Sequence, residues 1–101
     1  SDGSIRNGFT VKILNKVHEP RAFEISIMGL EGAQLSAVGL DPAARPRVVV
    51  ATDDLRELRM LVTVPAEAAA RLSGSSADFH FVITDVAEKR QATRLVRFQK
   101  P

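Results

Sequence analysis

The chain consists of short runs in which apolar and polar residues alternate, with turn residues between them. A period of two places every second side chain on one face of a β-strand. The pattern is clearest at 9–17, 22–28, 57–64, 78–84 and 92–98. In the first four runs, the side chains expected to face the core are Phe9, Val11, Ile13, Val17, Phe23, Ile25, Ile27, Leu58, Met60, Val62, Val64, Phe79, Phe81 and Ile83. Asn15 interrupts the apolar face of the first run, where we expect its amide to bond free backbone groups.

The remaining runs are less regular. In 92–98, either Thr93, Leu95 and Arg97 or Arg94, Val96 and Phe98 face inward, and we favour the register that buries Val96 and Phe98. Residues 34–38 predict a short strand, and 47–51 predict either an edge strand or an extended bridge. A loop with two prolines is expected between them, at 41–46.

Residues 65–72 are the only good helical segment. The segment is rich in alanine, the best helix former, and it begins with a proline, which suits a first turn. It is about two turns long and cannot stand alone. We therefore expect a short helix that bridges two sheets.

Six or seven short strands with regular turns and one helix predict an all-β fold, an antiparallel β-sandwich. With 101 residues there is room for one domain. The chain lacks Cys, Trp and Tyr, so the disulfide, the buried Trp and the tyrosine corner of antibody domains are all excluded.

Composition narrows the possible functions further. The net charge of +2 is too small to indicate a nucleic-acid partner. No apolar run reaches the roughly 20 residues that a membrane span needs. The lack of Cys excludes a thiolate metal site, a Cys nucleophile or an iron–sulfur cluster held by this chain alone. The start at Ser1 leads us to expect a processed product or an excised fragment.

Candidate site residues are scarce, and we assign none to catalysis or to cofactor binding. The weak candidates for a metal are His18, His80, Met28 and Met60, because imidazole and thioether groups bind copper. His18 lies in a turn, His80 is expected to face solvent between two inward Phe residues, and Met60 is expected to fill the core.

For the acidic and basic residues we expect structural or surface roles rather than a metal site. We expect Asp41, Asp53 and Asp54 to form turns and caps, because no calcium-loop spacing surrounds them. A basic cluster near the last hairpin is expected to form a solvated face, or to touch anionic lipid headgroups at a membrane-proximal position; it consists of Lys89, Arg90, Arg94 and Arg97.

The N-terminal quarter carries a more specific signal. Residues 2–16, DGSIRNGFTVKILNK, and residues 18–23, HEPRAF, resemble the opening of the C-terminal domain of the FixG/CcoG family. These are bacterial cytochrome oxidase accessory proteins. The resemblance implies an immunoglobulin-like β-sandwich at residues 9–101, preceded by a stalk at residues 1–8 that follows a membrane span of the parent protein.

The resemblance also implies what the parent protein does. The parent would be an integral protein of the bacterial inner membrane, with a cytoplasmic ferredoxin-like part that binds two 4Fe-4S clusters. It would assist assembly of the cbb-type haem–copper oxidase and the reduction of Cu(II) to Cu(I). The present domain would lie on the periplasmic side, without a cofactor of its own and without catalytic activity.

The expected role of the domain is therefore interaction or scaffolding, as a monomer, with protein partners of oxidase assembly or copper delivery. Sheet edges or loops would carry the contacts. Two alternatives stay open. One is a copper site within the domain, and the other is an appended sandwich module of an unrelated secreted protein, such as a glycoside hydrolase.

Overall fold

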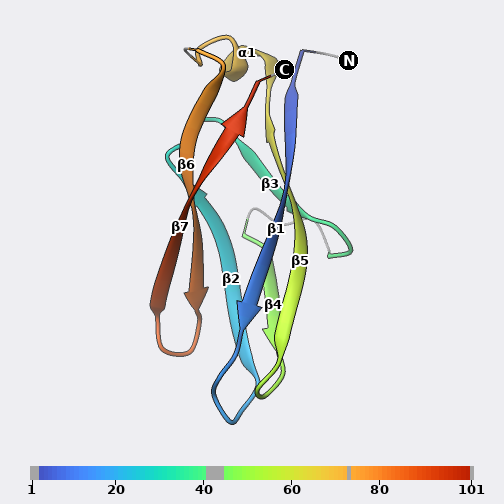
Figure 1. Cartoon of the computed structure of the whole chain (residues 1–101), viewed down its shortest axis with the longest axis vertical. Helices are drawn as coiled ribbons and strands as arrows, with labels where there is room; N and C mark the ends of the chain where they lie inside the picture. The colour runs from blue at the N-terminus through green and yellow to red at the C-terminus, as the bar shows by residue number, and fades with distance from the viewer. Residues whose placement is uncertain (1–2, 41–44, 73, 101) are drawn as a thin grey trace.

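The computed structural model describes residues 3–40, 45–72 and 74–100, and these form two face-packed sheets (Figure 1). The described part contains seven strands and one short helix, which confirms the expected antiparallel β-sandwich. The elements are β1 (Ile5–Leu14), β2 (Arg21–Met28), β3 (Gln34–Ala37), β4 (Arg47–Val50), β5 (Leu55–Val64), α1 (Ala66–Ala69), β6 (Ser76–Asp85) and β7 (Arg90–Gln99).

One sheet has the strand order β1-β5-β3, and the other has the order β4-β2-β6-β7. Neighbouring strands in both sheets run antiparallel. The helix α1 connects β5 of the first sheet to β6 of the second, as predicted, although it is shorter than the predicted 65–72. β4 is an edge strand, which decides between the two interpretations of residues 47–51. The predicted loop at 41–46 falls mostly outside the described residues.

The core follows the predicted alternation. Eight of the predicted inward side chains are buried: Ile13, Ile25, Leu58, Met60, Val62, Val64, Phe79 and Phe81. Five others are partly buried and pack against them: Phe9, Val11, Phe23, Ile27 and Ile83. Phe98 is fully buried and Val96 packs on the core, so the favoured register of the last strand is confirmed.

Both ends of β1 differ from the prediction. The strand begins at Ile5, and residues 5–8 pair with residues 61–64 of β5 instead of forming a stalk. The alternation extends back through Ile5 and Asn7, but a polar residue and Gly8 obscured it. At the other end the strand stops at Leu14, and Val17, expected in the core, is 40% exposed.

Asn15 directly follows the last residue of β1. Its side chain is buried, and its Nδ2 atom donates to the backbone oxygens of Glu19 at 2.9 Å, Val50 at 3.0 Å and Ala51 at 3.2 Å. Its Oδ1 atom accepts a hydrogen bond from the Val17 amide at 3.0 Å. The expected bonding of the Asn15 amide to backbone groups is confirmed, and it ties the β1–β2 turn to the end of β4.

Asn15→Ala removes these four hydrogen bonds, of which the one to Val50 is buried and the others are part-buried. We expect the free energy of unfolding to fall by about 2–3 kcal/mol, since each unsatisfied buried group costs about 1–3 kcal/mol. Urea denaturation measures the change. The control is Gln91→Ala, an exposed residue whose single side-chain bond, to Thr84, is 3.4 Å long; it should change stability by less than about 0.5 kcal/mol. Equal midpoints for the two variants would contradict this role of Asn15.

Candidate functional site

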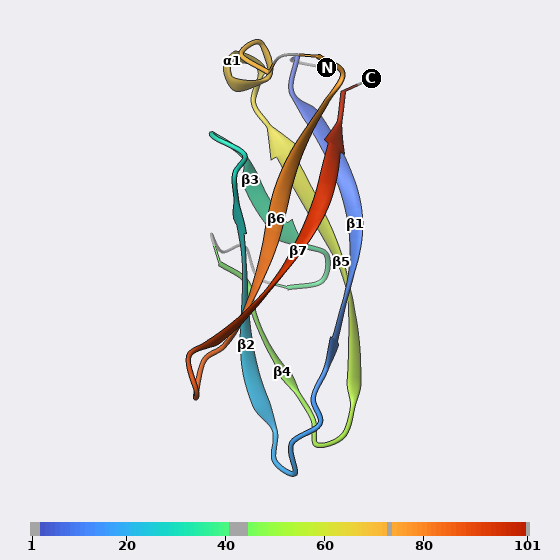
Figure 2. The same cartoon turned by 60° about the vertical axis from the view of Figure 1, so that its left-hand side comes forward.

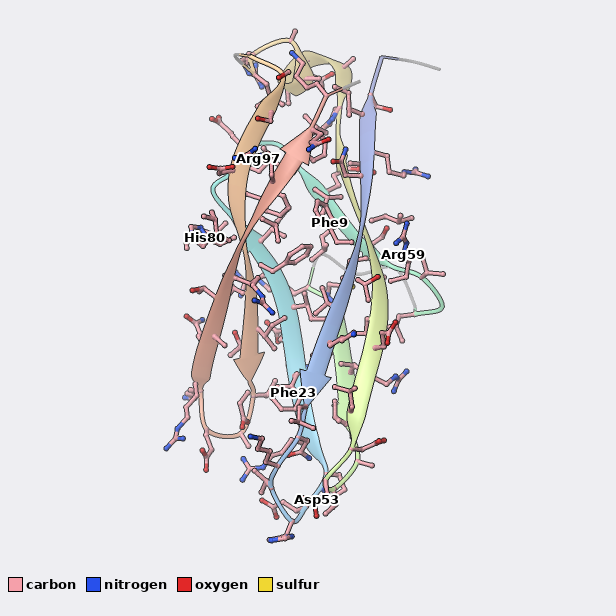
Figure 3. The ribbon with its side chains drawn as sticks, in the orientation of Figure 1. Phe9, Phe23, Asp53, Arg59, His80 and Arg97 are labelled. Atoms are coloured by element: carbon pink, nitrogen blue, oxygen red, sulfur yellow. The ribbon has the colours of Figure 1, made fainter. Side chains whose placement is uncertain are left out.

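The two histidines lie in different parts of the molecule. The side chain of His18 is 91% exposed in the β1–β2 turn, with its Nδ1 atom 3.4 Å from Oδ2 of Asp53. His80 is half-buried on β6, on the face opposite to that of its inward neighbours Phe79 and Phe81. Figure 3 shows His80 pointing away from the sandwich, while Asp53 lies in a loop at the far end. The structure therefore does not bring the two imidazoles together.

The two methionines are separated as well. Met60 is completely buried and fills the core, whereas Met28 is 55% exposed at the end of β2. In the β2–β6 register, Met28 stands directly opposite His80. Within the described ranges, no group of three or more His, Cys, Asp or Glu residues could hold a metal ion. Of the four sequence candidates, only Met28 and His80 are neighbours.

The charged residues expected in turns take that role where the structure describes them. Asp53 adopts a left-handed backbone conformation with φ of 54°, and Oδ1 of Asp54 accepts a hydrogen bond from the Leu55 amide at 2.9 Å. Asp41 lies outside the described residues. A hydrogen bond of 2.9 Å from Arg47 lowers the pKa of the Glu24 carboxyl, an exposed pair at the β2–β4 edge.

The basic cluster of the last hairpin is divided between the two faces of β7. Nε of Arg97 is 3.4 Å from the Asp78 carboxylate, and Nε of Arg90 is 3.4 Å from that of Glu88. Arg94 stands opposite Phe81, whose ring faces the core, so it comes from the inner face of the sheet. Among the residues that the structure describes, Arg94 has no ion pair.

A groove opens between β1 and β7, which are edge strands of different sheets. Its volume is about 730 Å³, and it is lined by residues 9–12 of β1, 92–96 of β7, and Phe81 and Ile83 of β6. A second hollow of about 300 Å³ shares Lys12, Ile83 and Ala92 with it and reaches residue 14 of β1 and residue 90 of β7. The sequence did not reveal this groove, because it depends on which strand edges face each other.

Beyond the residues that line the groove, the Asn7 side chain joins β1 to β7. Nδ2 of Asn7 donates to the backbone oxygen of Gln99 at 3.0 Å, and Oδ1 accepts from the Gln99 amide at 2.9 Å. From this contact β1 and β7 diverge toward the opposite end of the molecule, in both views (Figures 1 and 2). Where they diverge, the side chains of Ala92 and Arg94 are exposed.

The described part of the chain has no helix with the length and apolar character needed to cross a membrane.

Comparisons with known proteins agree on one family. The chain superposes on the crystal structure of a FixG-related protein from Vibrio parahaemolyticus with a TM-score of 0.81, at 18% identity, over 97% of this chain and 81% of that one. This likeness concerns the fold. The chain is also 28% identical, over its whole length, to the nitrogen fixation protein FixG of Rhizobium meliloti (strain 1021), of which it spans 19%.

The family model described as "IG-like fold at C-terminal of FixG, putative oxidoreductase" matches residues 1–101. The immunoglobulin-like sandwich predicted from the N-terminal motif is thereby confirmed. The chain belongs to the family of immunoglobulin-like domains found at the C-terminus of FixG.

Proposed function

We propose that this chain is a non-catalytic interaction domain of a FixG-type membrane protein. The observation that carries the proposal is the pair of free strand edges, on β1 and β7, that border an apolar and basic groove. Free edges and apolar grooves are surfaces on which domains capture extended segments of partner proteins. The partners are proteins of oxidase assembly or of copper delivery.

The redox chemistry belongs to other parts of the parent protein. The Rhizobium relative is about five times as long as this chain, since the chain spans 19% of it. Iron–sulfur clusters are held by Cys thiolates, and this chain has no Cys, so its residues do not fit such a group. We assign the two 4Fe-4S clusters implied by the resemblance to a ferredoxin-like part on the cytoplasmic side.

The domain itself lies on the periplasmic face of the bacterial inner membrane in this proposal. There it can hold a partner near the site of oxidase assembly. The parent supplies Cu(I) by reducing Cu(II), and the domain brings the recipient into reach.

Deleting residues 5–100 from the parent protein tests this role. We expect the amount of active cbb-type oxidase in membranes to fall several-fold, because the partner is no longer held. The iron–sulfur signal of the parent, measured by electron paramagnetic resonance, should stay the same per molecule of protein. That signal is the control for folding and insertion. Unchanged oxidase activity in the deletion strain would contradict the proposal.

A second candidate is a Cu(I) site formed by Met28 and His80. The observation that favours it is their register, because directly opposed residues of an antiparallel pair have Cβ atoms about 4.5–5.5 Å apart. A thioether and an imidazole are both suitable ligands for copper.

Titration of the 101-residue chain with Cu(I), in competition with a chromophoric chelator, tests this second candidate. We expect one Cu(I) per chain, with binding lost in Met28→Ala and in His80→Ala, because two ligands are the minimum. His18→Ala is the matched control and should bind as the original chain does, since His18 lies in the distant turn. If the original chain does not compete for Cu(I), the domain has no copper site of its own.

A further inference from the structure

The groove between β1 and β7 has an apolar floor. Phe9 and Val11 of β1 are only partly buried, and Phe81 and Ile83 of β6 form the opposite side of the same hollow. The Phe9 ring meets the rings of Phe79 and Phe81 edge-on, with centroids 5.5 and 5.4 Å apart. The groove is thus the place where the core of the sandwich reaches its surface.

The wall formed by β7 is unusual for an inner sheet face. Ala92, Arg94 and Val96, every second residue of β7, lie on the side of the sheet that faces the core. Ala92 and Arg94 are nevertheless exposed, because β1 has diverged from them. Lys12 lies at the rim of the groove, on the outer face of β1 and opposite Glu57 of β5. Neither Arg94 nor Lys12 forms an ion pair among residues 3–40, 45–72 and 74–100.

The dimensions suit one extended segment. The two hollows together border residues 9–14 of β1 and 90–96 of β7. At a rise of roughly 3.3 Å per residue, a stretch of this length is about 20 Å long and accommodates a strand of five or six residues. The outward edge of β7 has no neighbouring strand in the described sheet and can supply backbone hydrogen bonds to such a segment.

We propose that the groove binds an extended acidic segment of a partner protein, which adds to the free edge of β7 as a fifth strand of that sheet. The inner face of β7 sets the pattern of the segment: one carboxylate opposite Arg94, with an apolar side chain two residues away on either side, opposite Ala92 and Val96. Lys12 strengthens the binding of the carboxylate from across the groove. This inference rests on the proposed function as an interaction domain.

The charges also argue against a second copy of this chain as the occupant. A charged residue on the inner side of an edge strand is a common device against edge-to-edge pairing. Two copies joined along β7 would bring their unpaired Arg94 side chains onto one shared edge without an added carboxylate. The same unpaired Arg94 that opposes self-association selects an acidic partner.

Binding of a defined peptide tests the inference. The probe is an end-capped peptide with the core Val-Thr-Glu-Thr-Val, and its counterpart has Lys in place of Glu. In NMR spectra of the ¹⁵N-labelled 101-residue chain, the Glu peptide should shift the amide signals of residues 90–96 and 9–12. The affinity should be about tenfold higher than for the Lys peptide, because a charge-assisted hydrogen bond to Arg94 replaces a repulsion.

Charge reversal provides the sharper comparison. Arg94→Glu should reverse the preference, so that the Lys peptide binds more tightly than the Glu peptide, and Lys12→Glu should weaken the Glu peptide without reversing the order. Arg71→Glu is the matched control, because Arg71 is exposed beyond α1 and does not line the groove; it should leave both affinities unchanged. Both groove residues are at exposed or edge positions, and the amide spectra of the variants verify that they fold.

Several outcomes would overturn the inference: equal binding of the two peptides, shifts confined to other surfaces, or a concentration-dependent dimer that uses the same residues. Arg94→Glu in the parent protein separates this inference from the proposed function. Loss of oxidase activity in both Arg94→Glu and the domain deletion supports the groove as the binding site. Loss in the deletion alone overturns the groove but keeps the interaction role, and loss in neither overturns both.

Discussion

The contact between Asn7 and Gln99 joins the two sheets at their open side. The Asn7 amide makes the same two hydrogen bonds to Gln99, one donated and one accepted, that a backbone residue makes in an antiparallel ladder. A side chain thus takes the place of a paired strand at this point. Because the contact lies at one end of the molecule, β1 and β7 are held together there and diverge beyond it (Figure 2).

This arrangement leaves part of the core accessible. Phe79 and Phe98 are fully buried, while Phe9 closes the cluster from the side of the groove and stays partly exposed. A sandwich with β1 paired along the whole of β7 would cover this surface and both free edges. The feature that we connect with function is therefore the incomplete closure of an otherwise regular fold. Binding of a partner at this opening needs no catalytic group.

Much of the fold could be predicted from the sequence, because one face of each long strand is buried and alternation shows it. The apolar Val96 and Phe98 correctly indicated which face of β7 is directed inward. The same register places Arg94 on the inner face. The extension of β1 to Ile5 was missed because Gly8 resembles a turn residue. The guanidinium of Arg59 lies over Gly8, and this flexible side chain would have to shift to make room for a Cβ at that position. That packing involves a residue 51 positions away and leaves no local signal.

The site was less predictable than the fold. The sequence singled out His18, His80, Met28 and Met60 by their chemistry, and the structure places only Met28 beside His80. The groove depends on two strands at opposite ends of the chain and on the angle between their sheets. The alternation of apolar and polar residues within one strand predicts neither which strands lie side by side nor the angle between the sheets. An Arg in the inward register of β7, beside Val96 and Phe98, was the one local signal that could have pointed to this surface.

Amide hydrogen exchange in the free 101-residue chain tests the central claim, that β1 and β7 are separate edges, most directly. An edge strand has a partner on one side, so only every second amide is bonded. We predict alternating protected and fast-exchanging amides at residues 9–13 and 91–96, and continuous protection in the central strands β5, β2 and β6 where they are paired on both sides. Continuous protection across residues 9–13 and 91–96 would show that the two strands pair with each other, and would contradict the open groove.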